Sequence, residues 1–258
     1  MTTAVAPRAT VHARPFRVLL HTEALLFARS AGAVVWTALA PVAALIALGS
    51  IHGVRQPSKS LHGISYLDAY LPILMMFSLC MSTVNILPPT LAQYREKGIL
   101  RRLSTTPVPP RRLLAAQAAI YLGIAVAVSV VLLVVAVAAY GVAVPHQLPG
   151  FVLSLALVAA ATTGLGLLVA GLAPSGKAAN ALSMALFFPL MFLAGLWIPR
   201  NEMPSALRTV SDYSPLGAGV RSVQSSIAGH WPPTAGLLVL AAYGVVFCGL
   251  AVRTFRWE

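Results

Sequence analysis

The stretch LLAAQAAIYLGIAVAVSVVLLVVAVAAYGVAVPHQLPGFVLSLALVAAATTGLGLLVAGLAPSG, residues 113–176, runs for 64 residues without an Asp, Glu, Lys or Arg. A helix needs about 20 apolar residues to cross the roughly 30 Å hydrocarbon core of a bilayer, so this stretch is too long for one crossing. In its middle, PHQLPG at residues 145–150 has the composition of a tight polar turn. The stretch therefore predicts two membrane spans joined by a short turn.

Four other windows without charged residues are each long enough for one crossing: residues 30–54, 69–94, 178–199 and 222–252. Of the 258 residues, 58% are hydrophobic and 9% are charged, which leaves little for a separate globular domain. We predict an all-α membrane protein with six transmembrane helices near residues 31–51, 69–89, 115–139, 151–172, 179–198 and 233–252. The expected organisation is a tail at residues 1–13, an interfacial helix at residues 14–29 and a transmembrane domain at residues 30–258.

The net charge of +12 would suggest a nucleic-acid partner for a soluble protein. Its distribution indicates membrane topology instead, because 13 of the 18 Lys and Arg residues fall on one side of the predicted spans. The other side has only Arg55, Lys59, Arg200, Arg208 and Arg221. By the positive-inside rule both termini and the loop at residues 90–112 are cytoplasmic. We expect a multi-pass plasma-membrane protein in a lipid bilayer, with no nucleic-acid partner.

Residues 14–29 can form an amphipathic helix on the cytoplasmic leaflet, with basic side chains toward anionic lipid. Glu23 projects into the apolar stripe of this helix. It either snorkels at the edge of the stripe or forms a salt bridge to an arginine of the 90–112 loop, Arg101 or Arg102.

The connection between spans 5 and 6 has helical signals of its own. Asn201 can cap a short helix toward Asp212, and Ser214 with Pro215 reads as an N-cap followed by proline at the first helical position. Apolar residues then recur at helical spacing: Leu216, Val220, Val223 and Ile227. We expect short re-entrant or interfacial helices here, an ordinary surface loop being the alternative.

Three prolines, Pro41, Pro72 and Pro189, lie within or near the start of predicted spans. Each removes a backbone donor and should kink or interrupt its helix. A membrane protein tolerates this where neighbouring groups satisfy the freed carbonyls.

The chain has few groups for catalysis or ion coupling. It contains six acids, none of them in the middle of a predicted span, whereas proton- and sodium-coupled transporters commonly use intramembrane carboxylates. Its six histidines lack metal-ligand spacing, and no G-x-x-x-x-G-K-[ST] loop for a nucleotide is present in the sequence. We expect a protein that is not an enzyme and binds no metal or cofactor, so that any uphill movement draws its energy from another subunit.

The loop after span 2 reads LAQYREKGILRRLSTTPVPPRR, residues 91–112. It resembles the hallmark loop of ABC-2 type transporter permeases, R-E-x-G-x-[LI]-[RK]-x-L-x-x-[TS]-P. The matching residues are Arg95, Glu96, Gly98, Leu100, Arg101, Leu103, Thr106 and Pro107. The six-span plan and the acid-bearing helix before span 1 agree, so the resemblance covers nearly the whole chain. It is most similar to the small drug- and antibiotic-export permeases of actinobacteria, the daunorubicin-resistance membrane subunit among them.

The resemblance implies an ABC-2, type V exporter-like fold in which two permease chains, identical or different, work with two separate ATPase chains. ATP and Mg would be bound by the ATPase and not by this chain. The residues expected to contact the ATPase are Tyr94, Arg95, Glu96, Lys97, Gly98, Arg101, Arg102, Thr106 and Pro107. The alternative is a basic loop that only holds the topology on anionic lipid.

In this family spans 2 and 5 line the central cavity. The corresponding residues here are Ser78, Ser82 and Asn85 on span 2 and Asn180, Ser183, Phe187 and Met191 on span 5. Such a mildly polar lining, rich in aromatic and sulfur atoms, suits an amphipathic drug, antibiotic or lipid-like natural product, although helix packing alone is an alternative. Export of a lipid-linked polysaccharide is the second hypothesis, and a passive channel or structural membrane protein is the third.

Overall fold

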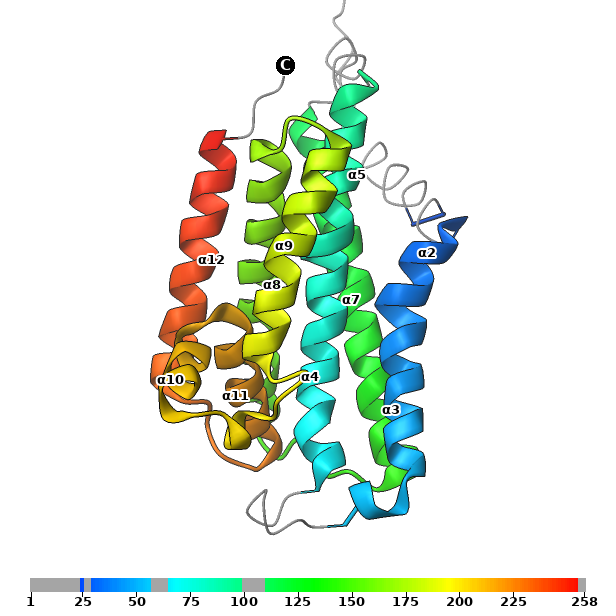
Figure 1. Cartoon of the computed structure of the whole chain (residues 1–258), viewed down its shortest axis with the longest axis vertical. Helices are drawn as coiled ribbons and strands as arrows, with labels where there is room; N and C mark the ends of the chain where they lie inside the picture. Colours follow the sequence, from blue (N-terminus) through cyan, green and yellow to red (C-terminus); the bar gives the residue numbers. More distant parts are fainter. Residues whose placement is uncertain (1–23, 26–28, 57–64, 99–109, 255–258) are drawn as a thin grey trace, which may run out of the picture.

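The computed structural model describes residues 24–25, 29–56, 65–98 and 110–254. In these ranges the chain folds as a bundle of long helices lying roughly side by side (Figure 1). Six segments have the length and composition of membrane spans: Ala31–Ser50, Tyr66–Glu96, Ala115–Tyr140, Leu148–Leu172, Gly176–Ala194 and Thr234–Thr254. The prediction of an all-α protein with six transmembrane helices is confirmed.

Spans 1 and 2 are each interrupted by a π-helical segment. Span 1 comprises α2 (Ala31–Val34), η1 (Val35–Leu39) and α3 (Ala40–Ser50), and a 3₁₀ turn, η2 (His52–Val54), follows it. Span 2 comprises α4 (Tyr66–Cys80), η4 (Met81–Ile86) and α5 (Leu87–Glu96). The remaining elements are α7 (Pro110–Tyr140), α8 (Leu148–Leu172), α9 (Gly176–Ala194), η5 (Arg200–Glu202), α10 (Ser205–Tyr213), α11 (Pro215–Ile227) and α12 (Thr234–Thr254).

Two predicted span ends need correction. Span 2 does not stop near residue 89. Its helix continues to Glu96, and Gly98, two residues later, has a left-handed φ of 65°. Span 5 ends at Ala194 rather than 198, because Gly195 takes a left-handed φ of 94° as its C-terminal cap. In both cases a glycine supplies the left-handed conformation that other residues adopt at a cost.

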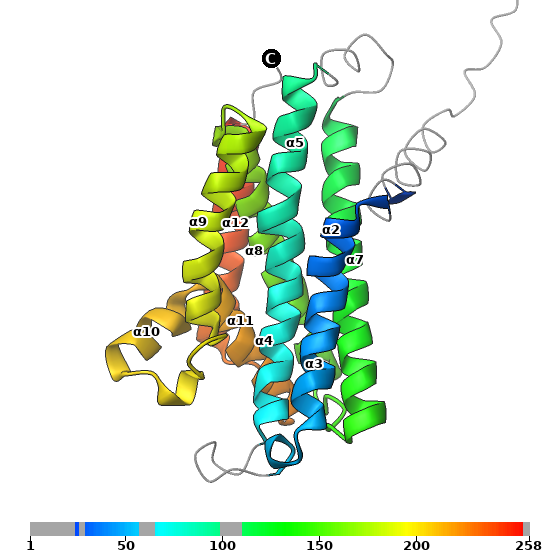
Figure 2. The ribbon, with the colours of Figure 1, turned by 45° about the vertical axis from the view of Figure 1, so that its right-hand side comes forward.

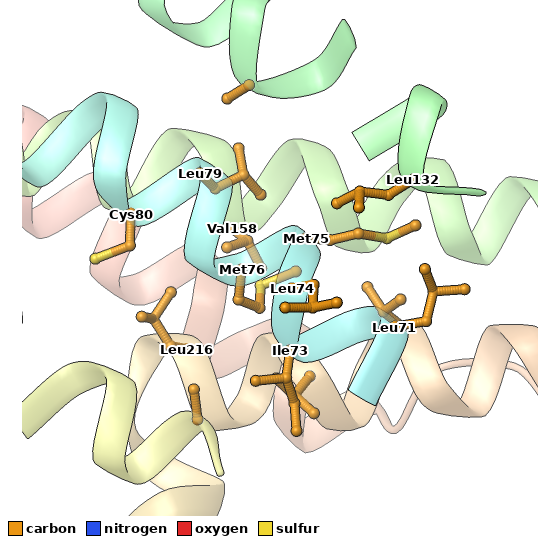
Figure 3. Packing of buried hydrophobic residues seen from close by; sticks show 14 of the residues in the cluster. Leu71, Ile73, Leu74, Met75, Met76, Leu79, Cys80, Leu132, Val158 and Leu216 are labelled. Atoms are coloured by element: carbon orange, nitrogen blue, oxygen red, sulfur yellow. The ribbon is translucent and has the colours of Figure 1, made fainter. Parts of the chain in front are cut away.

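Span 2 is the axis of the fold. In Figures 1 and 2, α4 runs between α9 on one side and α3 on the other. Its side chains Leu71, Met75 and Met76 are fully buried and pack toward Leu132 of α7 and Val158 of α8 (Figure 3). In span 2, 78% of the membrane-spanning window is buried, against 17% in span 6. Span 6 is therefore a peripheral helix, and a displacement of span 2 must be felt by most of the bundle.

The backbone carbonyl that Pro41 leaves without a helical donor is hydrogen-bonded by a neighbouring span, as predicted. Because Pro41 has no N–H, the carbonyl of Thr37 cannot receive the usual helical bond from residue 41. The buried Ser78 hydroxyl of α4 donates to this carbonyl at 2.9 Å. A second close contact lies at η4, where a β-carbon on Gly166 would come within 1.8 Å of the carbonyl oxygen of Thr83. Both π-helical segments are therefore held by contacts with other spans.

The end of the bundle opposite to the C-terminal end of α5 carries the two short helices α10 and α11 (Figure 1). The Ser214 hydroxyl caps α11 by accepting a bond from the Gly217 amide at 3.1 Å, with Pro215 at the first helical position as predicted. The predicted apolar face of α11 is buried, namely Leu216, Val220, Val223 and Ile227. The start of α10 was predicted wrongly: it begins at Ser205 after Pro204, and Asn201 belongs to η5.

Candidate functional site

The described part of the predicted ATPase contact is the last turn of α5 and the residues after it. Glu96 and Lys97 are exposed, while Tyr94, Arg95 and Gly98 are half-buried. The other predicted contact residues, Arg101, Arg102, Thr106 and Pro107, lie outside the described residues. Glu23 and most of the interfacial helix at residues 14–29 also lie outside them, so the proposed salt bridge of Glu23 stays a prediction.

Arg95 contacts another part of the same chain. Its guanidinium donates through Nη2 to the carbonyl of Ala173 and through Nη1 to the carbonyl of Ala170, the latter at 3.4 Å. Both carbonyls belong to the C-terminal end of α8, and the carbonyl of Ala170 has no helical donor because residue 174 is Pro174. A cation at a helix C-terminus satisfies such carbonyls and interacts favourably with the helix dipole. Arg95 therefore caps span 4.

The neighbouring side chains of α5 contact the start of span 5. A β-carbon on Gly176, the first residue of α9, would lie 2.8 Å from Gln93 Cγ and 3.3 Å from Glu96 Oε2. Three small buried residues, Ala92, Ala173 and Ala179, allow the backbones to approach closely here. We call this set of contacts the α5 clasp: Gln93, Arg95 and Glu96 against Ala170, Ala173 and Gly176. It joins the end of span 2 to both sides of the α8–α9 turn.

A groove of about 600 Å³ lies between spans 1, 2 and 5. Its polar groups are few, chiefly the side chains of Ser30, Asn85 and Asn180. The remaining lining is apolar and aromatic: Gly32, Ala33, Trp36, Phe77, Met81, Ile86, Met184, Phe187, Phe188, Leu196 and Trp197. The volume and this mixture are typical of sites that bind small organic molecules.

Four aromatic rings of the groove are in successive contact. Phe77 meets Phe187 edge to face at 5.7 Å between ring centroids, and Phe187 meets Phe188 at 5.8 Å. Phe188 in turn stacks on Trp197 at 6.2 Å. Rings at such separations attract one another beyond simple burial, so they form one continuous aromatic wall.

The structure brings together some of the predicted path residues but not others. Asn85, Asn180 and Phe187 line the groove. Ser78 and Ser82 are buried between helices instead, Ser82 donating to the carbonyl of Tyr121 at 2.7 Å. Ser183 and Met191 are also buried and do not line the groove. These four side chains are packed between helices.

Trp36 and Trp197 are lining residues that sequence reasoning missed. They come from η1 and from the segment after α9, and no local spacing connects them to spans 2 and 5. Phe188 was detectable, because Asn180, Met184 and Phe188 recur every four residues on one face of α9.

A second groove of about 540 Å³ lies between α9, α10 and α12. Its lining is mainly aliphatic and aromatic, including Leu186, Leu190, Val210 and Phe247. It lacks side-chain amides such as those of Asn85 and Asn180, so the groove of spans 1, 2 and 5 is the better candidate for binding an amphipathic molecule.

Six helices with the length and composition of membrane spans, three of which line a groove with an aromatic wall and two amides, define a polytopic membrane protein. The sequence profile of the ABC-2 type transporter family matches residues 14–228, and the chain belongs to this family. It is 29% identical over 190 residues to the inner membrane transport permease YhhJ of Escherichia coli K12 and equally to that of Shigella flexneri. These alignments cover 69% of this chain and 49% of each relative, so the chain spans about half the length of the curated relatives it matches.

Proposed function

We propose that this chain is the membrane subunit of an ATP-driven ABC-2 exporter of an amphipathic drug, antibiotic or lipid-like natural product. The observation that carries the proposal is the groove between spans 1, 2 and 5, whose lining combines an aromatic wall with the amides of Asn85 and Asn180. Aromatic rings provide large apolar contact area, and two amides provide hydrogen bonds without charge, which suits a molecule with apolar and polar parts. The chain itself would not be an enzyme.

The groove is open along one side, and this supports a second permease chain. Trp36, Phe188 and Trp197 are 56%, 55% and 51% exposed. On a membrane span such side chains are covered either by lipid or by another chain. A second copy or a related chain placed against spans 1 and 5 would cover these rings and enclose the substrate path.

The energy would come from two ATPase chains that bind ATP and Mg and contact the α5 end of the bundle. In support, Lys97 remains exposed there, at the start of the family loop. By the positive-inside rule, the charge distribution supports a cytoplasmic location for this end and both termini of a plasma-membrane protein. Labels at Ser104 and Lys177 should then react only from the cytoplasm and labels at Ser58 and Ser205 only from outside; external labelling of Ser104 in intact cells would contradict this orientation.

The test is co-expression with the ATPase encoded beside this gene, followed by purification and reconstitution in proteoliposomes. We expect a stable complex whose ATP hydrolysis rises several-fold with an anthracycline-like amphiphile and whose transport requires ATP. A Walker-defective ATPase is the control for passive leakage.

Two outcomes would favour the other functions. Stimulation by a lipid-linked saccharide and not by the amphiphile would indicate polysaccharide export. Solute flux through the purified chain without an ATPase would indicate a passive channel, and a chain that binds no ATPase and moves no solute would be a structural membrane protein.

A further inference from the structure

We propose that Arg95 and Glu96 are positioning residues that fasten the end of span 2 to the α8–α9 turn, so that the α5 clasp moves as one unit during transport. This inference rests on the proposed function, and it assigns to the two residues a role different from direct contact with the ATPase. Movement delivered at the end of α5 would then reach spans 4 and 5 through the clasp itself.

The first support is the capping of α8. The Arg95 guanidinium contacts two carbonyls from different positions, Ala170 and Ala173, and Pro174 removes the backbone donor that would otherwise serve the first of them. A charge-assisted bond from a planar, forked donor holds two acceptors in fixed geometry. Separating α5 from α8 would break both bonds and leave the end of α8 without its cap.

The second support is the lack of space at α9. Gly176 leaves no room for a β-carbon beside Gln93, and the Glu96 carboxylate lies at the N-terminal end of α9, where a negative charge is favoured. Ala92 packs with Ala173 and Ala179 beneath these side chains. The end of α5 thus contacts both sides of the α8–α9 turn, through polar side chains and through the buried alanines next to them.

The clasp connects two walls of the groove. α9 begins at Gly176 and carries Asn180 and Phe187, while α5 continues without a break into η4, which carries Asn85. Because one rigid contact fixes the ends of both helices, spans 2 and 5 should shift together. Span 1 provides the third wall through Trp36 of its η1 segment.

A disulfide across the clasp tests whether it moves as a unit. The 2.8 Å between Gln93 Cγ and a β-carbon on Gly176 brings the two β-carbons close enough for a disulfide, whose Cβ–Cβ separation is about 3.5–4.5 Å. The variant Gln93→Cys/Gly176→Cys is made in a Cys248→Ala background, because Cys248 is the exposed native thiol among the described residues. We expect rapid oxidation and transport within about twofold of the reduced variant. Failure to crosslink, or transport lost on oxidation and regained on reduction, would overturn the proposal.

Substitution of Arg95 supplies an independent readout. Arg95→Ala should keep the ATPase in the purified complex and keep basal ATP hydrolysis, while substrate moved per ATP falls about tenfold. Arg95→Lys should recover only part of this ratio, since one ammonium cannot reproduce the fork. The matched control is Gly249→Ala on α12, which lies in neither the clasp nor the groove and whose added β-carbon meets no atom within 4 Å.

The possible outcomes distinguish a failure of the clasp proposal from a failure of the proposed function on which it rests. Loss of the ATPase from the Arg95→Ala complex would show that Arg95 is a docking contact and overturn the proposal. Absence of ATPase from the wild-type preparation would refute the proposed function itself. The crosslink yield is measured without ATP or ATPase, so it would still test the close contact between Gln93 and Gly176.

Discussion

The two ends of the bundle are held together in different ways. At the α10 end the chain closes on itself: α11 is buried among the spans, and Asp212 binds Arg200 at 2.6 Å and Arg221 at 3.5 Å. At the α5 end the structure shows the α5 clasp, in which Glu96 is exposed, and Lys97 is exposed next to it. At the first end the Asp212 carboxylate is paired within the chain, whereas at the second end the charged side chains of Glu96 and Lys97 are exposed.

The glycines at the two ends show the same contrast. A β-carbon on Gly217 would lie 2.1 Å from the backbone oxygen of Ser211, where α10 meets α11. A β-carbon on Gly176 would meet the side chain of Gln93. Backbone cannot give way without moving a helix, but a flexible side chain can rotate. An added methyl group must therefore move a helix at the α10 end, whereas at the α5 end the Gln93 side chain can make room for it.

The largest effect is expected for Gly217→Ala. The new methyl group must push α11 away from α10, and overpacking of this kind costs about 1–3 kcal/mol or more. We expect a large fall in the thermal midpoint and in the monodisperse yield of purified protein, with Gly32→Ala as the unaffected control. A midpoint equal to that of the wild type would mean that the two ends do not differ in rigidity.

An intermediate effect is expected for Asp212→Asn. The Asp212 and Arg200 side chains are only 20% and 24% exposed, and loss of the carboxylate leaves two guanidinium groups without their shared partner. We expect a loss of about 1–3 kcal/mol in the free energy of unfolding. Arg221→Gln should cost at most about 1 kcal/mol, because Arg221 is 42% exposed and its contact is longer. Equal losses in both variants would contradict this account of the cluster.

A smaller effect on stability is expected for Gly176→Ala at the α5 end. Since Gln93 can rotate away, the loss should not exceed about 1 kcal/mol. The double variant Gln93→Ala/Gly176→Ala, which removes the obstructing side chain, should recover the wild-type midpoint. A loss as large as that of Gly217→Ala would remove the distinction between the two ends.

The smallest effect on stability is expected for Asn85→Ala, between the two ends. Its amide contacts Met81 Sδ at 3.0 Å and Met184 Sδ at 3.7 Å, and thioether sulfur is a weak acceptor. The thermal midpoint and the ATPase association should stay unchanged. Substrate preference, measured as stimulation of ATP hydrolysis across a set of amphiphiles, should change; an identical preference would exclude Asn85 from the substrate path.

The sequence alone determined the spans, the family loop and the Ser214 cap of α11. The length of an apolar run sets whether it crosses a bilayer, and a cap involves only residues close in the chain, so both are local properties. The end of span 2 was placed too early for a related reason. The hydrophobicity falls near residue 89, but nothing stops the helix before Gly98, so the helix outlasts its apolar segment.

Only the tertiary structure decided which side chains meet. Ser78, Ser82 and Asn85 were predicted to line the cavity together. In the structure η4 adds a residue to the helical turn and rotates Asn85 into the groove, while the serines face spans 1 and 3. Arg95 was read as a contact for the ATPase, and its acceptors within the chain are carbonyls 75 and 78 residues away. Backbone carbonyls have no signature in sequence, because every residue has one; only packing determines which are left unpaired and which arginine reaches them.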